Sequence, residues 1–137
     1  MYSNFKLSGE FMCDFEGDFG DGRTAFIYQL RDSNIDLYPI TVYSDGSLKL
    51  LDGTRLNGVA ASERWFLVEM YLNLSEHTVT MFVDGKKVID NKKCLADSFK
   101  KLNLTRVQVR SGGFTGQLQC RKMEFTGLDK PYRGEEI

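Results

Sequence analysis

Apolar and polar residues alternate along most of this chain, which is the pattern that half-buried β-strands produce. The alternation is strongest in residues 65–72 and 78–83, which are separated by the turn-like tripeptide Ser75-Glu76-His77. Because the side chains of a strand point alternately to opposite sides, one set from each segment is expected in the core. That set is Val68, Met70, Leu72, Val79, Met81 and Val83.

The same alternation predicts further strands along the chain. Their expected positions are residues 5–15, 24–31, 37–44, 48–50, 87–89, 106–110 and 117–125. The dipeptides Asp45-Gly46 and Asp84-Gly85 are tight-turn signatures, so each predicts a hairpin between the strands that flank it.

Two short stretches modify this picture. In residues 37–44 the alternation places Tyr38, Ile40 and Val42 together on one side of the strand, and Pro39 indicates that this strand lies at an edge or begins late. Helical spacing occurs only in residues 92–102, where it predicts at most a short helix between strands. About ten short strands with almost no helix therefore predict an all-β fold, a two-sheet antiparallel sandwich.

Length and composition set the class of protein. At 137 residues, the chain is expected to form a single β-sandwich domain over residues 1–137. The formal net charge of −1 gives no strong field to attract nucleic acid or anionic membranes. No apolar run approaches the roughly 18 residues of a membrane span, and the first residues lack the apolar stretch of a signal peptide. These observations fit a cytoplasmic protein and equally a module excised from a longer secreted chain.

Cysteine and histidine content leaves little room for metal or nucleophilic chemistry. The three cysteines, Cys13, Cys94 and Cys120, cannot form a fully paired framework, and small buried thiols are the favoured interpretation. Cys13 and Cys120 could still face each other if the first and last strands pair. His77 is the only histidine, so neither a zinc site nor a Ser-His-Asp arrangement is indicated.

The centre of the chain carries a family resemblance. A tryptophan-led strand at 64–72 is followed by a hairpin strand that ends in the turn Val83-Asp84-Gly85-Lys86. Residues 107–109 and 116–118 match the strand, glycine-rich loop and closing strand that come later in such domains. The pattern resembles concanavalin A-like lectin/glucanase domains, near the laminin G-like branch, and covers residues 64–127 well and the first half loosely. Trp65 is expected to face the core, with sugar stacking as the alternative.

The resemblance implies a jelly-roll sandwich of the concanavalin A-like type. That superfamily contains lectins, carbohydrate-binding modules, glucanases, lyases and adhesion domains, so the fold alone does not select a function. In these sandwiches one sheet is concave and can hold a glycan.

The acidic stretch DFEGDFGDG, residues 14–22, could be an acid/base pair, a calcium loop or a solvated turn. Retaining glucanases of the resembling superfamily carry two glutamates flanking an aspartate on one strand. Here the order differs and glycines interrupt the strand, so no catalytic role is assigned. EF-hand spacing also fails, but some laminin G-like relatives bind calcium, so an irregular calcium loop remains an alternative to the favoured solvated turn. Its candidate ligands are Asp14, Glu16, Asp18 and Asp21.

The polar face of the central sheet is the second candidate site. Amide, guanidinium and aromatic groups together suit hydroxyl-rich or carboxylated sugars. The alternative is the ordinary solvated face of an antiparallel sheet, but outward-facing aromatic residues favour a binding face. The predicted ligand-binding residues are Gln29, Arg31, Tyr43, Glu69, Tyr71, Phe82, Arg106, Gln108 and Arg110, and Thr80 shares their face.

These features favour a non-catalytic carbohydrate-binding, lectin-like or accessory module of a larger extracellular glycan-active protein. The expected partners are a glycan or polysaccharide and neighbouring domains of the same chain, not nucleic acid, and no cofactor is expected apart from the candidate calcium ion. The expected location is extracellular or at the cell surface, with the cytoplasm left open. Two alternatives are a protein-interaction or adhesion module of the laminin G-like type, and a glycoside hydrolase or polysaccharide lyase.

Overall fold

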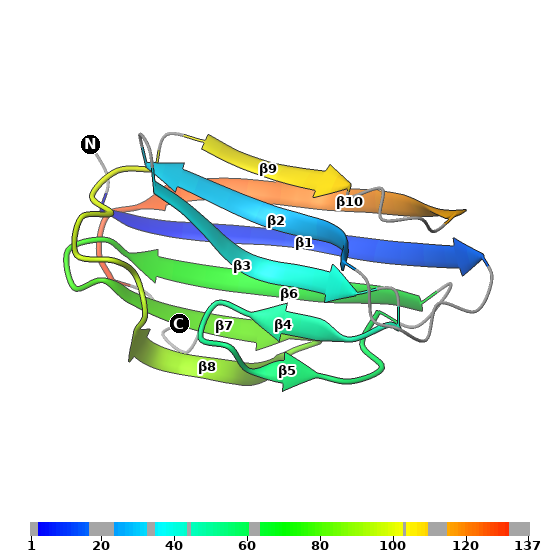
Figure 1. The fold of residues 1–137 in the computed structure, drawn as a ribbon. Helices are drawn as coiled ribbons and strands as arrows, with labels where there is room; N and C mark the ends of the chain where they lie inside the picture. The colour runs from blue at the N-terminus through cyan, green and yellow to red at the C-terminus, as the bar shows by residue number, and fades with distance from the viewer. Residues whose placement is uncertain are drawn as a thin grey trace. The chain divides into compact units, whose positions relative to one another are not determined.

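The computed structural model describes residues 3–16, 24–32, 35–43, 45–60, 64–102, 104–109 and 115–131. These residues form ten strands and no helix, which confirms the predicted all-β class (Figure 1). The strands are β1 (Asn4–Glu16), β2 (Thr24–Asp32), β3 (Ile35–Tyr43), β4 (Leu48–Leu50), β5 (Arg55–Leu56), β6 (Arg64–Asn73), β7 (Thr78–Val83), β8 (Lys86–Lys93), β9 (Leu104–Val109) and β10 (Thr115–Leu128).

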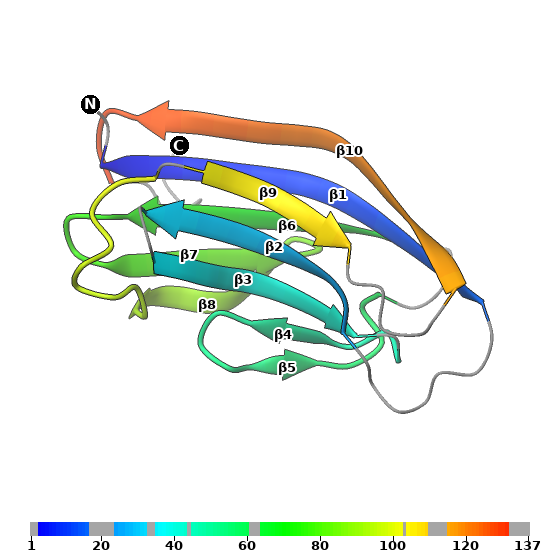
Figure 2. The same cartoon turned by 45° about the horizontal axis from the view of Figure 1, so that its top comes forward.

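The strands are arranged in two five-stranded sheets (Figures 1 and 2). The first sheet has the order β10-β1-β6-β7-β8 and the second has the order β5-β4-β3-β2-β9. Antiparallel hairpins connect β6 to β7 and β7 to β8. The second of these hairpins uses the predicted Asp84-Gly85 turn, in which φ is 52° and 79°, as a two-residue hairpin turn requires.

The chain forms two compact units, each assembled from separated segments. The first unit comprises Met1–Glu10, Leu67–Lys101 and Cys120–Ile137, and the second comprises Phe11–Phe66 and Leu102–Gln119. The strands β1, β6 and β10 contribute residues to both units, whereas the second sheet lies wholly within the second unit.

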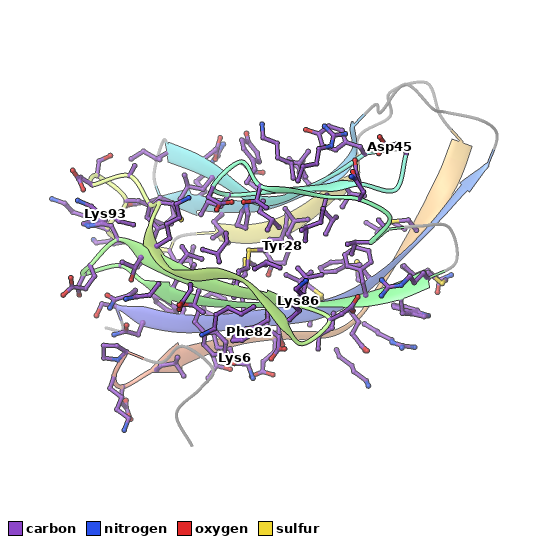
Figure 3. All side chains as sticks on the ribbon, turned by 90° about the horizontal axis from the view of Figure 1, so that it is seen from below. Lys6, Tyr28, Asp45, Phe82, Lys86 and Lys93 are labelled. Atoms are coloured by element: carbon purple, nitrogen blue, oxygen red, sulfur yellow. The ribbon has the colours of Figure 1, made fainter. Side chains whose placement is uncertain are left out.

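The core of the second unit joins strands from both sheets. Phe11 of β1 is fully buried, and its ring centroid lies 5.7 Å from that of Phe66 on β6 and 6.2 Å from that of Tyr28 on β2. Because β1 and β6 belong to the first sheet and β2 to the second, the two sheets share an interior here, which defines a β-sandwich. Figure 3 labels Tyr28 among these inner side chains.

In the first unit, the side chains predicted to face the core are buried. All six members of the predicted inward set from β6 and β7 have at most 5% of their surface exposed. The strand register places Val68 opposite Val83, Met70 opposite Met81 and Leu72 opposite Val79. Directly opposed apolar pairs of this kind each stabilise a sheet by about 0.2–1 kcal/mol.

The short helix predicted in residues 92–102 is wrong. Lys92 and Lys93 end β8, and the following residues form turns and irregular chain. Leu95 and Phe99 are buried at 4% and 0% exposure, and the Leu95 N–H donates to the carbonyl of His77 at 3.2 Å. The apolar residues with helical spacing are therefore buried positions of the irregular connection that follows β8. The hydrogen bond of Leu95 joins this connection to the β6–β7 turn.

The positions of Trp65 and Tyr38 also differ from the predictions made from the sequence. Trp65 is half-buried and alternates with Phe66 and Val68, which are 1% exposed, so the prediction that it faces the core is wrong. Tyr38, predicted to share a side of the strand with Ile40 and Val42, is 40% exposed, whereas those two residues are 0% exposed. Between the pairs Tyr28–Ile40 and Leu30–Leu37, β2 has one intervening residue and β3 has two. This β-bulge in β3 reverses the alternation of its side chains.

Pro39 lies within the same bulge. The strand β3 is an inner strand of its sheet, so the expected edge position is wrong for the strand as a whole. However, β4 pairs only with residues Ile40, Thr41 and Val42 of β3, and Pro39 lies beyond that paired segment. A residue without an N–H is tolerated at such a position.

The structure bears on three further expectations: the contact of Cys13 with Cys120, the absence of a membrane span and the domain organisation. The neighbouring positions of β1 and β10 would permit contact between Cys13 and Cys120, yet both are thiols, Cys13 buried and Cys120 exposed. No helix among the described residues is long and apolar enough to cross a membrane. The jelly-roll connectivity and the single-domain organisation remain predictions.

Candidate functional site

The predicted ligand-binding residues do not share one sheet. Five lie on the second sheet: Gln29, Arg31, Tyr43, Arg106 and Gln108. Three lie on β6 and β7 of the first sheet: Glu69, Tyr71 and Phe82. The expectation of one continuous face is therefore wrong. The side chains of Arg106 and Gln108, and Arg110 as a whole, lie outside the described part of the chain.

The outer side of the β6–β7 hairpin is covered in part by its own side chains and by residues of β8. Tyr71 is only 6% exposed, and its ring meets the ring of Phe82 edge-on, with centroids 6.2 Å apart. The ammonium group of Lys87 lies 5.8 Å from the centroid of the Phe82 ring. Thr80, opposite Tyr71, is 1% exposed, and its hydroxyl accepts a hydrogen bond from the Asn91 N–H at 2.9 Å. The aromatic residues that favoured binding on this hairpin are thus packed against neighbours.

On the outer side of the second sheet, Asp36 holds two of the predicted residues in place. Its Oδ1 accepts hydrogen bonds from Gln29 Nε2 at 2.8 Å and from Arg31 Nε at 2.7 Å, and its Oδ2 accepts one from Arg31 Nη2 at 3.2 Å. The hydrogen bond to Asp36 raises the pKa of the Arg31 guanidinium. Gln29 is 2% exposed, so its amide serves to orient Asp36 and is not itself open to a ligand.

At the other end of β3, Tyr43 is fixed by Arg55. The guanidinium carbon of Arg55 lies 4.2 Å from the centroid of the Tyr43 ring, and Arg55 Nη2 donates to Ser47 Oγ at 2.8 Å. Ser47 in turn donates to Asp45 Oδ1 from its hydroxyl at 2.6 Å and from its backbone N–H at 2.9 Å. These hydrogen bonds lower the pKa of the Asp45 carboxyl. These contacts link Tyr43, Asp45, Ser47 and Arg55 at one end of the β3–β4 hairpin.

Between these two networks the surface is hollowed. A depression of about 240 Å³ is lined by Asp36, Leu37, Tyr38, Thr41, Lys49, Leu50 and Leu51. Thr41 and Lys49 form a directly opposed pair on β3 and β4, and their side chains alternate with the buried Ile40 and Leu50. The β-bulge brings Tyr38 to the same depression by turning it away from the core. We call this surface the Tyr38 depression.

The Tyr38 depression combines the groups that sugar recognition uses. Tyr38 offers an aromatic surface with 40% exposure, Asp36 a carboxylate, Thr41 a hydroxyl and Lys49 an ammonium group. Its volume lies below the roughly 300–1,000 Å³ of sites for drug-sized ligands, which suits one small ring more than an extended cofactor. Because Asp36 is already held by Gln29 and Arg31, it is pre-organised to accept hydrogen bonds from a ligand.

The residues that line the depression were largely missed by sequence reasoning. Asp36, Tyr38, Thr41 and Lys49 were not among the predicted ligand-binding positions. The available signal was Pro39, because a proline inside an otherwise regular strand marks a bulge at which the alternation changes side. Without that break, the alternation placed Tyr38 on the same side of the strand as Ile40 and Val42.

The acidic stretch is described only at its beginning. Asp14 and Glu16 lie at the end of β1, but their side chains are not described, and Asp18 and Asp21 lie outside the described residues. Among the described residues no group of three or more His, Cys, Asp or Glu is placed to hold a metal ion. The calcium loop therefore stays a prediction.

Comparison with known proteins adds no relative. No family model matches the chain, and no curated protein matches it. The resemblance to concanavalin A-like domains consequently remains a prediction from the residues of β6, β7 and the β7–β8 turn.

Proposed function

We propose that the protein is a non-catalytic carbohydrate-binding module of an extracellular glycan-active protein, and that it holds a sugar ring in the Tyr38 depression. The supporting observation is the exposed ring of Tyr38 beside a depression lined also by Asp36, Thr41 and Lys49. The polar groups would exchange hydrogen bonds with hydroxyls, and the aromatic ring would cover the apolar face of the sugar.

Binding on a sheet surface fits the energetics of a modest, reversible interaction. The depression is shallow and formed by two paired strands and a bulge, so little of the protein has to move when a ligand enters. An aromatic contact contributes about 0.5–1.5 kcal/mol, so the aromatic residue is expected to account for a measurable part of the affinity.

The proposal is tested by screening the protein on an array of neutral and acidic glycans, with and without calcium, and then measuring the dissociation constant for the best ligand by calorimetry. Tyr38→Ala is expected to weaken binding about tenfold, the equivalent of about 1.4 kcal/mol, while Tyr38→Phe keeps most of the affinity.

The matched control is Phe125→Ala, which removes another exposed aromatic ring, 50% exposed on β10. Its affinity is expected to equal that of the unaltered protein. If the protein bound no glycan on the array, or if both alanine variants lost affinity equally, the sugar site at Tyr38 would be refuted. Release of reducing ends or unsaturated products from a bound polysaccharide would instead show an enzyme.

A further inference from the structure

The charge of the whole chain is nearly balanced, but residues 84–101 form a basic segment. Residues 84–101 contain six lysines and three aspartates, a formal charge of +3, so the rest of the chain carries −4 of the total of −1. The lysines are Lys86, Lys87, Lys92, Lys93, Lys100 and Lys101. We call them the lysine strip.

Four of the six lysines lie on β8, whereas Lys100 and Lys101 lie in the connection from β8 to β9. The strand β8 comes last in the order of the first sheet, with β7 as its described neighbour. Lys86 and Lys93 are its first and last residues, and Figure 3 shows them toward its opposite ends. At about 3.3 Å per residue, the strand separates them by roughly 20 Å.

The lysines of this strip present their charge to solvent. The side chain of Lys93 is 65% exposed, and five of the six lysines are exposed as residues, with Lys87 half-buried. The lysines also have partners within the protein: Lys87 Nζ lies 3.4 Å from Asp90 Oδ1 and Lys93 Nζ lies 3.3 Å from Asp97 Oδ1. Lys92, Lys100 and Lys101 each interact with a further group as well. Both aspartates are largely exposed, at 68% and 81%, so a ligand anion can compete with them.

From this arrangement we propose that the lysine strip is a second binding site, and that its ligand is an extended anionic polysaccharide, carboxylated or sulfated. A single exposed ion pair contributes little. A chain of regularly spaced anions can engage the lysines at the two ends of β8 at once, and linked contacts combine into useful affinity. The choice of a polysaccharide as the ligand rests on the proposed carbohydrate-binding function. The inference of an anion-binding site on β8 rests on the positions of the lysines and does not depend on that function.

The test compares the unaltered protein and three variants by titration with heparin, polygalacturonate, single-stranded DNA and neutral dextran at several salt concentrations. The variant Lys86→Gln/Lys92→Gln/Lys93→Gln removes three charges from the strip and is expected to weaken binding of the anionic polymers about tenfold or more, with a shallower salt dependence. The corresponding triple Lys→Arg variant keeps the charge and is expected to bind normally. Lys6→Gln/Lys122→Gln/Lys130→Gln makes the same change in net charge at positions on β1, on β10 and just after β10 and is expected to bind normally.

The outcomes separate the two sites. Equal weakening in the strip variant and the matched charge control would overturn the lysine strip as a specific site. Tighter binding of single-stranded DNA than of either anionic polysaccharide would overturn the choice of ligand. Tyr38→Ala is expected to leave binding of the anionic polymers through the strip unchanged, so loss of array binding in that variant alone concerns only the proposed function. Circular dichroism confirms that each variant is folded.

Discussion

The outer sides of two hairpins, β6–β7 and β3–β4, carry similar patterns in the sequence and have different surfaces in the structure. On β6–β7, Tyr71 and Phe82 pack edge to face, and Tyr71 is 6% exposed. On β3–β4, the β-bulge turns Tyr38 to solvent with 40% exposure, beside a depression of about 240 Å³. The aromatic residues of β6–β7 pack against each other, whereas Tyr38 of β3–β4 is exposed to solvent.

The difference shows that alternation and exposure are separate properties of a strand. Alternation decides on which side of the sheet a residue lies, whereas the neighbouring strands decide whether the residue is covered. Tyr71 is placed on the outer side as its position in β6 predicts, yet it is buried by neighbours such as Phe82. Tyr38 breaks the alternation and is for that reason accessible.

The largest expected effect is on stability. Tyr71→Ala is expected to lower the free energy of unfolding by about 3 kcal/mol, because it empties a buried aromatic site. Tyr38→Ala is expected to lower it by less than about 1 kcal/mol, because the ring is largely exposed. Urea denaturation monitored by circular dichroism measures both. Similar losses in the two variants would show that the hairpins do not differ as described.

A smaller effect is expected at the support of the Tyr38 depression. Asp36→Ala removes the acceptor of the buried Gln29 amide and is expected to cost about 1–2 kcal/mol of unfolding free energy. Asp36→Asn keeps one acceptor oxygen and is expected to cost less. Denaturation midpoints of the two variants test this order. An asparagine variant as unstable as the alanine variant would indicate that the carboxylate charge, and not the hydrogen bond, is what matters.

The smallest expected effect concerns two carboxyls with lowered pKa values. The hydrogen bond from Arg121, aided by the charges of Arg121 and Lys122, lowers the pKa of Glu10, while hydrogen bonds from Ser47 lower the pKa of Asp45. Each group therefore stabilises the fold above its unfolded pKa, and this contribution is lost as the pH falls through its folded pKa. At about 1 M salt, where the screening length is about 3 Å, the pKa of Glu10 is expected to rise more than that of Asp45.

Titration of both carboxyls by NMR at low and high salt measures this difference. Ser47→Ala serves as the matched control, because it is expected to raise the pKa of Asp45 and leave that of Glu10 unchanged. At Asp45 the neutral donors of Ser47 have the larger effect on the pKa, and Arg55, 3.5 Å from Asp45 Oδ2, has a smaller one. Equal salt sensitivity of the two carboxyls would contradict this order and the dominance of cationic donors at Glu10.

Sequence reasoning recovered the regular parts of the molecule. The core positions of β6 and β7 and the turn at Asp84-Gly85 follow from alternation and turn chemistry, because each depends on residues close in the chain. The Tyr38 depression did not follow, since it needs the pairing of β2 with β3 to create a bulge and the pairing of β3 with β4 to bring Lys49 beside Thr41. The division of the predicted face between two sheets is likewise a property of long-range pairing.

The extra residue in β3 also affects how this surface can evolve. The Tyr38 side chain is 40% exposed, while Ile40 and Val42 on the same strand are 0% exposed, so replacing Tyr38 is expected to leave the core positions undisturbed. We expect position 38 to accept varied residues at little structural cost. If the proposed sugar site is correct, directed evolution that diversifies this one position would change its ligand preference without changing the fold.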